Sequence, residues 1–506
     1  MKEMAKYMII MASLMTVEVT TIDTKDDETH NYNIERLYYP IFINVCDISD
    51  RTSKVHCYCD SPKRKLATKA DCWVFNGGIA EDDPIWPSFS TQSQLEELIF
   101  NVRSDGGLTF IPAKAIVRLD NLKYLSIQYG TITSIPSYAF TNSSTIKQII
   151  LKSNKIANLE RHSFAHMMML SNLSLEENHI SELKRDVFFA LPNLHILHIS
   201  NNNISLIHEG TFKHLNNLME LKLEYNLISV VTREMLEGLE NLSRLDLRNN
   251  KLTMVGNLAF SELWSLKELL LDNNAIEFIS ERAFGGLSQL RKLSLSGNKL
   301  TTFYEDILDD LRNILVLDLS YNQLETISYD TVRSVIENDK ATSAAVYLDG
   351  NPFTCDCRLS WIYVLRNETK DNNLRMVLER VSCVSDVGLE RKLNKMNDVA
   401  DVRMIDGNKV DNGEESYEDY DKNYGITNNL MYDDPTQQEV KSKKLIDIPL
   451  EVLPCPKELM QSMEETYGHP VQNEIRLKAF SKKTFVVILL LRLLIYSYCF
   501  VYICKM

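Results

Sequence analysis

The sequence predicts an α/β-type solenoid, a fold in which one short structural unit is stacked many times along an axis. One indication is an asparagine that returns every 24 residues, and another is a frame of regularly spaced leucines before each asparagine. A third is that none of the ten cysteines lies in this regular part of the chain. The interval of 24 joins Asn154, Asn178, Asn202, Asn226, Asn250, Asn274, Asn298 and Asn322.

The frame Leu-x-x-Leu-x-Leu-x-x-Asn-x-Leu alternates apolar and polar residues, which predicts a strand with one buried face. In the copy that begins at Leu242, we expect Leu242, Leu245 and Leu247 to point inward. Each buried leucine contributes roughly 1.5–3 kcal/mol, but only when neighbouring turns exclude water from it. We expect Asn250, like the other seven asparagines, to pair with backbone groups of the adjacent turns.

Counting the starts of the frame predicts ten repeats and a closing turn that ends near Asn351. A second apolar residue, usually phenylalanine, follows ten residues after each asparagine position and is expected to fill the opposite side of the core. The repeats open at Leu95, Leu122, Ile146, Leu170, Leu194, Leu218, Leu242, Leu266, Leu290 and Ile314.

Two groups of four cysteines flank the repeats and predict disulfide-stapled caps at the two open ends of the core. The groups are Cys46, Cys57, Cys59 and Cys72, and Cys355, Cys357, Cys383 and Cys455. Spacing alone leaves three connectivities open for each group. A zinc site at Cys57-x-Cys59 is disfavoured because the gap is short and no histidine pair completes it.

The stretch Asn351-Pro-Phe-x-Cys355-x-Cys357-x-Leu-x-Trp361 closely resembles the C-terminal cap of extracellular leucine-rich repeat proteins. The resemblance implies a curved horseshoe with parallel strands on its concave face and a disulfide-stapled cap at each end. It also implies the pairs Cys355–Cys383 and Cys357–Cys455. For the N-terminal cap we expect Cys46–Cys59 and Cys57–Cys72.

Catalytic and metal-binding motifs are missing from the sequence. There is no glycine-rich phosphate loop, nucleophile elbow or convergent carboxylate pair, and His162 and His166 lack the glutamate of a metalloprotease helix. We therefore expect no enzyme, no catalytic residue, no metal site and no cofactor.

The N-terminus and five glycosylation sequons predict export. Lys2 and Lys6 precede an apolar stretch from Tyr7 to Val17, which is too short to span a bilayer and typical of a signal peptide. The sequons predict N-linked glycans at Asn142, Asn172, Asn203, Asn241 and Asn367. Together these features predict a glycoprotein of the secretory pathway.

The C-terminal cap is interrupted, because about seventy residues separate Cys383 from Cys455 where the family has around twenty. The middle of the interruption, from Asn412 to Asp421, is acidic and nearly free of aliphatic residues, so it cannot bury enough apolar area to offset its ordering entropy. We interpret 395–440 as a disordered spacer; a second interpretation is that Tyr417 and Tyr420 become sulfated and bind a basic partner.

The chain ends in an apolar run, 485–504, that is interrupted by Arg492. A glycosylphosphatidylinositol signal is favoured over a single-pass helix, since Lys482 and Lys483 contradict the positive-inside preference, although no trio of small residues marks an attachment site. The expected organisation is a signal peptide (1–20), a flexible segment (21–45), an N-terminal cap (46–94), repeats with a closing turn (95–350), a C-terminal cap (351–394 and 441–460) around the insertion (395–440), a spacer (461–484) and the tail (485–504).

The concave strand face is the expected binding surface, because its outward positions are free of the core requirement. They carry both signs of charge and several tyrosines, which suits a protein partner, possibly a second copy of the chain. A nucleic-acid partner is excluded by the lack of a basic stripe and by the net charge of −14. The candidate contacts are Tyr129, Glu176, Glu177, Lys222, Glu224, Tyr225, Asp246, Arg248, Asp272 and Tyr321.

The cap motifs also carry a narrower resemblance, to insect leucine-rich repeat proteins of the cell surface that mediate adhesion. It rests on Cys57-Tyr-Cys-Asp60, Cys72-Trp-Val-Phe-Asn-Gly-Gly78, Asp83-Pro-Ile-Trp-Pro87 and Cys355-Asp-Cys-Arg-Leu-Ser-Trp361. The resemblance implies homophilic adhesion in nerve–muscle target recognition, with a lipid anchor on the outside of the plasma membrane. The alternative is a ligand-binding receptor or immune recognition protein that lacks a signalling domain.

Overall fold

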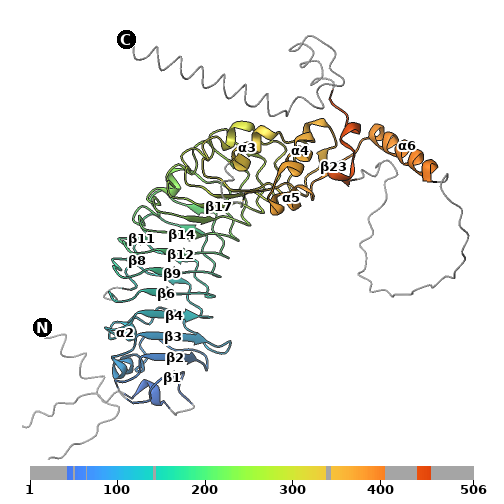
Figure 1. The fold of residues 1–506 in the computed structure, drawn as a ribbon. Coiled ribbons are helices and arrows are strands. Elements are labelled where there is room, and N and C mark those ends of the chain that lie inside the picture. Colours follow the sequence, from blue (N-terminus) through green and yellow to red (C-terminus); the bar gives the residue numbers. More distant parts are fainter. Residues whose placement is uncertain are drawn as a thin grey trace, which may run out of the picture. The chain divides into compact units, whose positions relative to one another are not determined.

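The computed structural model describes residues 43–48, 52–63, 65–140, 144–337, 344–404 and 442–456. These residues form two compact units. Unit 1 contains the described residues up to Ala275 together with Arg282–Leu290, and unit 2 contains Ile276–Glu281 and those from Arg291 onward. Figure 1 shows the strands of unit 1 stacked one after another in sequence order.

The main sheet of unit 1 begins with an antiparallel pair, β1 and β2, and continues as parallel strands. Each later strand pairs with the next repeat in register, so that Glu220, Leu221 and Lys222 lie beside the equivalent residues 24 positions on. The strands are β1 (Val55–Cys59), β2 (Lys69–Val74), β3 (Glu97–Val102), β4 (Tyr124–Gln128), β6 (Gln148–Ile150), β9 (Asn172–Ser174), β12 (Ile196–His198), β14 (Glu220–Lys222), β15 (Arg244–Asp246) and β17 (Glu268–Leu270).

The predicted solenoid is confirmed, and each of the ten predicted repeats contributes one strand. Eight lie in unit 1, from β3 to β17, and two lie in unit 2, β19 (Lys292–Ser294) and β20 (Val316–Asp318). The closing turn adds β21 (Ala345–Tyr347), which pairs in parallel with β20.

The core of each repeat is made by the leucines of the frame and by the second apolar residue. Leu242 and Leu245 are fully buried, and so are the rings of Phe164, Phe188 and Phe212. These three rings stack along the solenoid, with centroids 5.9 and 6.3 Å apart. Burying one such ring per turn fills the side of the core away from the main sheet.

Short elements line that second side of unit 1, where the chain returns toward the next strand. They are β5 (Ser134–Ile135), β7 (Asn158–Leu159), β8 (Phe164–Ala165), β10 (Glu182–Leu183), β11 (Phe188–Phe189), β13 (Leu206–Ile207), β16 (Met254–Val255), the short helix α2 (Ala113–Ile116) and the 3-10 helix η3 (Glu234–Leu236).

The asparagines form the hydrogen-bonded ladder that the sequence predicts. Asn226 Oδ1 accepts from the backbone N–H of Ile204 at 3.0 Å, and its Nδ2 donates to the carbonyls of Ile199 and Leu223 at 3.1 and 3.0 Å. The side chain is buried. It therefore satisfies backbone groups of two neighbouring turns that the core would otherwise leave without partners.

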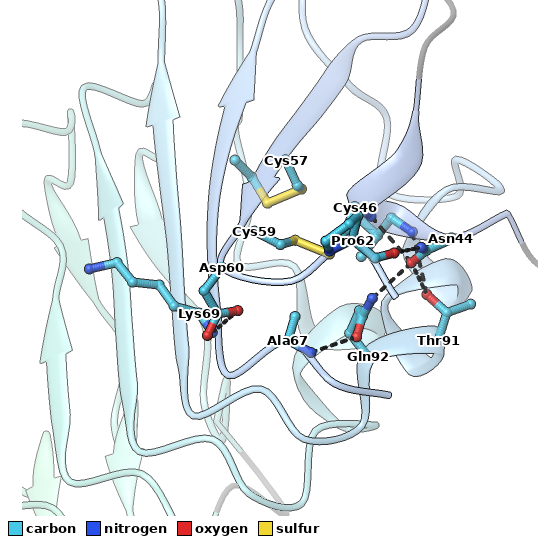
Figure 2. Close-up of a disulfide and its surroundings, with 12 residues drawn as sticks. Asn44, Cys46, Cys57, Cys59, Asp60, Pro62, Ala67, Lys69, Thr91 and Gln92 are labelled. Carbon is cyan, nitrogen blue, oxygen red and sulfur yellow. Dashed lines mark hydrogen bonds between the residues drawn. A yellow bond between two sulfur atoms is a disulfide. The ribbon is translucent and has the colours of Figure 1, made fainter. Parts of the chain in front are cut away.

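The N-terminal cap closes unit 1 with two disulfides, Cys46–Cys59 and Cys57–Cys72 (Figure 2). Beneath them the buried Gln92, at the end of η2 (Trp86–Gln92), accepts from the Ala67 backbone N–H at 3.2 Å and donates to Asn44 Oδ1 at 2.9 Å. The short helix η1 (Val45–Asp47) carries Cys46 over this end of the core.

Unit 2 contains the C-terminal cap, where β22 pairs in parallel with β23 and β23 pairs antiparallel with β24. Cys355–Cys383 and Cys357–Cys455 join its segments. Its remaining elements are β18 (Phe278–Ile279), η4 (Glu305–Leu308), α3 (Tyr329–Glu337), β22 (Phe353–Thr354), η5 (Cys357–Leu359), α4 (Ser360–Glu368), α5 (Asn372–Leu378), β23 (Ser382–Val384), α6 (Val387–Met404), β24 (Ser442–Lys444), η6 (Leu445–Asp447) and η7 (Leu450–Val452).

The cap differs from the sequence prediction at the start of the insertion. Residues 395–404, expected to be disordered, continue helix α6 to Met404. Met396, Val399, Ala400 and Met404 follow a helical period, but the acidic middle of the insertion led to the whole segment being interpreted as disordered. The rest of the insertion, the signal peptide, the spacer, Tyr417, Tyr420 and the tail at 485–504 lie outside the described residues. Within the described part of the chain, no helix has the length and apolarity to cross a membrane.

Candidate functional site

The outer strand face is formed by side chains that point away from the core at the first, third and fifth positions of each repeat, counted from the first strand residue. In β14 these are Glu220, Lys222 and Glu224. The next residue, here Tyr225, lies beyond the end of the strand and precedes the buried ladder asparagine. We call this sixth position the corner.

From the second repeat to the closing turn, every corner residue has a left-handed backbone, with φ between 54° and 73°. This conformation is unfavourable for residues other than glycine and, to a lesser degree, asparagine. The left-handed conformation was not predicted from the sequence, although glycine or asparagine at five of the ten corners indicates it. The corners are Tyr129, Ser153, Glu177, Asn201, Tyr225, Asn249, Asn273, Gly297, Tyr321 and Gly350.

The corner turns its side chain toward solvent at the edge of the sheet. Tyr129, Tyr225 and Tyr321, three of the predicted contacts, are 61%, 56% and 63% exposed. Glu177 is exposed as well. Exposed tyrosines on a fixed backbone are well suited to anchor a protein partner. Tyr321 belongs to unit 2, and the other three residues belong to unit 1.

A chain of ion pairs crosses the outer strand face of unit 1. At its N-terminal end, Lys152 lies 3.0 Å from Glu177 and 3.9 Å from Glu176. The ammonium of Lys152 and the hydroxyl of Ser153 both donate to Glu177, which lowers the pKa of this carboxylate, with Ser153 the larger cause. The charges are therefore held in place before any partner arrives.

The middle of the face is centred on Glu220 and Arg244, which face outward as expected but are not among the ten predicted contacts. Glu220 lies 3.2 Å from Lys222 and 4.0 Å from Arg244. Arg244 also donates to Glu268 in the next strand. The network thus runs without a break from β14 to β17.

Asp246 departs from its expected exposure, because its side chain is fully buried at the third position of β15. Arg248 donates to both carboxylate oxygens, from Nε at 2.9 Å to Oδ1 and from Nη2 at 2.6 Å to Oδ2. Alternation along a strand gives the direction of a side chain but not its depth, and long neighbours on both flanking strands cover the third position. Asp246 therefore positions Arg248 rather than meeting a partner itself.

His198 occupies the third position of β12 between two acidic residues, with Nδ1 3.8 Å from Glu176 and Nε2 3.6 Å from Glu220. Burial lowers the pKa of this imidazole below its ordinary value, and the nearby ammonium of Lys222 lowers it further. The two glutamates act in the opposite direction but do not reverse the shift. His198 is accordingly held neutral at pH 7.

Comparisons with known proteins agree with this repeat geometry. The family described as "Leucine rich repeat" matches residues 120–180, 169–228, 192–252 and 240–300. Residues 120–300 are leucine-rich repeats. A segment of 80 residues is 38% identical to Connectin of Drosophila melanogaster and covers 16% of this chain but only 12% of Connectin. The match supports the leucine-rich repeat superfamily and does not single out Connectin within it.

Solved structures with this leucine-rich repeat architecture are more distant. A complex of Latrophilin 3, Unc5D and FLRT2 is 20% identical at a TM-score of 0.45, over 59% of this chain and 80% of that one. A leucine-rich repeat protein of Leptospira interrogans is 26% identical at a TM-score of 0.46, and the match covers 56% of this chain and 68% of that one. The Toll–Spatzle complex of Drosophila is 19% identical at a TM-score of 0.48, and the match covers 62% of this chain and 48% of that one.

The caps are stapled by disulfides, and three of the sequons are exposed. Disulfide-capped leucine-rich repeats belong to the secreted or cell-surface environment, where disulfides persist. Asn203, Asn241 and Asn367 are exposed, whereas Asn172 is half-buried at the first position of β9, on the outer strand face itself. Asn142 lies outside the described residues.

The described residues contain no group of three or more histidine, cysteine or acidic side chains arranged to hold a metal ion. Cys57 and Cys59 are engaged in disulfides. His162 accepts or donates a 2.8 Å hydrogen bond with the hydroxyl of Tyr138, and His166 packs against the ring of Phe189. These contacts give both histidines a structural setting on the second side of the repeats.

Proposed function

We propose that this protein is a cell-surface recognition molecule that binds a protein partner through the outer strand face and joins cells by homophilic adhesion. The observation that supports the proposal most directly is the preordered row of opposite charges from Lys152 to Glu268, bordered by the exposed Tyr129 and Tyr225. Side chains that are already fixed lose less entropy on binding, and mixed charge excludes mismatched partners.

The resemblance of the cap motifs to Connectin supports the adhesive role and extends it to recognition between nerve and muscle cells. The match to Connectin covers 16% of this chain, and the role in nerve–muscle recognition rests on this match and on the cap motifs. A ligand-binding receptor of the same architecture is the competing function, and no feature of the described residues favours it over adhesion.

A cell-aggregation assay tests the proposal. Non-adhesive cells that express the full chain are expected to form clusters with one another and to exclude cells that lack it. Surface staining with an antibody to an N-terminal tag controls for delivery to the membrane. Dispersed cells that display the protein and bind a soluble ligand would replace adhesion with the receptor function.

We propose further that the protein is tethered by a lipid anchor at its C-terminal tail and carries N-glycans at Asn203, Asn241 and Asn367. Phosphatidylinositol-specific phospholipase is expected to release it from intact cells, and retention would indicate a spanning helix. Peptide mapping before and after enzymatic deglycosylation reads out each sequon, and unmodified peptides at all three exposed positions would contradict the glycan assignment.

A further inference from the structure

Two neighbouring strands of the outer face carry mirror-image charge patterns. The first, third and fifth positions of β14 are Glu220, Lys222 and Glu224, and the same positions of β15 are Arg244, Asp246 and Arg248. The charge order is therefore minus, plus, minus on one strand and plus, minus, plus on the next. Each position on one strand has the opposite charge from its equivalent on the other.

Several polar atoms beside this pair of strands are buried but have no hydrogen-bond partner among the described residues. They include Oε2 of Glu224, Oγ of Ser200 and Nε2 of His198. Leaving such atoms unpaired is unfavourable, because water is removed and nothing replaces it. These three atoms lie on two adjacent repeats, while the other three such atoms of the described residues belong to Asn154, Ser261 and Asp371.

Arg248 supplies the matching donor. Its side chain is 40% exposed, and its bonds to Asp246 use Nε and Nη2 but not Nη1. The carboxylate of Asp246 holds the plane of this guanidinium fixed, so a second acceptor can approach it without further ordering. An acidic side chain of another molecule would complete its bonding.

We infer that two copies of this chain pair face to face about a two-fold axis that runs parallel to the strands, between β14 and β15. Such an axis reverses the order of repeats but keeps the strand positions, so β14 of one copy lies over β15 of the other. Glu220 then meets Arg244 and Glu224 meets Arg248, while Lys222 lies above the buried Asp246, which makes no direct contact across the interface. Every contact occurs twice, as in any isologous interface.

The flanking strands fit the same arrangement. The axis places β12 of one copy over β17 of the other, so Asp272 at the fifth position lies above the buried Ser200. The exposed Tyr225 lies at the edge of the paired strands, opposite the corner residue Asn249. The interface has a charged, preordered centre and an aromatic residue at its border.

This inference rests on the proposed homophilic adhesion and names the surface that performs it. The same charges also interact along the sheet within one molecule, as in the 3.2 Å contact of Lys222 with Glu220. A purely intramolecular role would give the same alternation. The test must therefore separate contacts between copies from contacts within one copy.

The test uses two charge reversals, Glu220→Arg and Arg244→Glu, each in the full chain on a separately labelled population of non-adhesive cells. Both side chains are partly exposed, and Asp246 keeps its two bonds to Arg248, so the fold is expected to persist. Thermal unfolding of the secreted ectodomain checks this for each variant.

Each reversal alone places like charges opposite each other twice, and we expect it to reduce homotypic clustering about tenfold or more. Cells with Glu220→Arg mixed with cells with Arg244→Glu should cluster together, because both contacts then join opposite charges. The double variant should also regain homotypic clustering. Only contacts between copies can be rescued by mixing two single variants.

Matched controls come from an exposed ion pair on the second side of the same region, Lys213 and Glu237, whose charged atoms are 3.3 Å apart. Lys213→Glu and Glu237→Arg change the net charge by the same amounts as the test variants. Both should cluster like the wild type. A loss of clustering in them would show that net charge, rather than this surface, sets the response.

The outcomes separate the two proposals. Failure of wild-type cells to cluster contradicts homophilic adhesion itself. Wild-type clustering that survives both reversals, or reversals that fold but are not rescued by mixing, leaves adhesion standing and overturns the β14–β15 interface.

Discussion

The guanidinium of Arg248 donates to both oxygens of the Asp246 carboxylate, which is fully buried in the middle of β15. Removing the Arg248 side chain would leave this charge with the backbone N–H of residue 248, at 3.2 Å, and with the more distant Arg244, 3.8 Å away. We expect Arg248→Ala to lower the free energy of unfolding by about 1–3 kcal/mol, because a buried charged acceptor loses its main donors.

Chemical denaturation of the secreted ectodomain measures this loss. Lys123→Ala is the control, since Lys123 pairs with Glu96 at 2.7 Å but both side chains are nearly half exposed. Its effect should stay within about 1 kcal/mol, as for other surface pairs. Equal effects of the two substitutions would show that the burial of Asp246 does not matter for stability.

The asparagine ladder predicts a second loss of stability. Asn226→Ala removes an acceptor for the Ile204 N–H and donors for two carbonyls, all in the buried core. We expect a loss of about 1–3 kcal/mol, from backbone groups left without partners. Asn216→Ala on the exposed surface is the control. An Asn226→Ala variant as stable as the wild type would contradict the role of the ladder.

The corners give a test of backbone conformation rather than of side-chain contacts. Asn249 has φ of 55°, and its N–H donates to the carbonyl of Asp272 at 2.9 Å. Valine, which is branched at Cβ, should destabilise the fold by roughly 1–2 kcal/mol at this position, whereas glycine should be nearly neutral. Comparable unfolding midpoints for Asn249→Val and Asn249→Gly would refute the argument.

His198 predicts a dependence of stability on pH. Its pKa in the fold lies below the ordinary 6.5, so the unfolded chain takes up a proton more readily as the pH falls through this value. Stability from this group is thus fully present above pH 6.5 and is lost progressively below it. Between pH 7.5 and 5.5 the wild type should lose more stability than His198→Gln, and parallel melting curves would argue against the shift.

The regular part of the fold was predictable because alternation and a fixed period specify both the strand and its neighbours. Leu242, Leu245 and Leu247 are buried as the frame requires, and the strand begins at Arg244 between them. The direction in which each side chain points on the outer strand face could also be predicted from this alternation. The extent to which each side chain is buried could not be predicted, because the burial of Asp246 depends on side chains from adjacent turns that no local pattern reveals.

Other features were hidden for different reasons. The left-handed corners were signalled by Gly297 and Gly350, but Tyr225 and Tyr321 adopt the same conformation without any local cue. The hydrogen bonds of the following ladder asparagine impose it from outside the residue. The opposite charge patterns of β14 and β15 could be compared position by position only after the register of the two strands was known.

In most repeats, one buried asparagine side chain holds the backbone of neighbouring turns in place. The outward side chains of the strand face therefore contribute little to the fold. Mutation can therefore alter the outer strand face while the scaffold stays intact. A lineage built on this plan can diversify its recognition by small steps, each of which leaves a foldable protein.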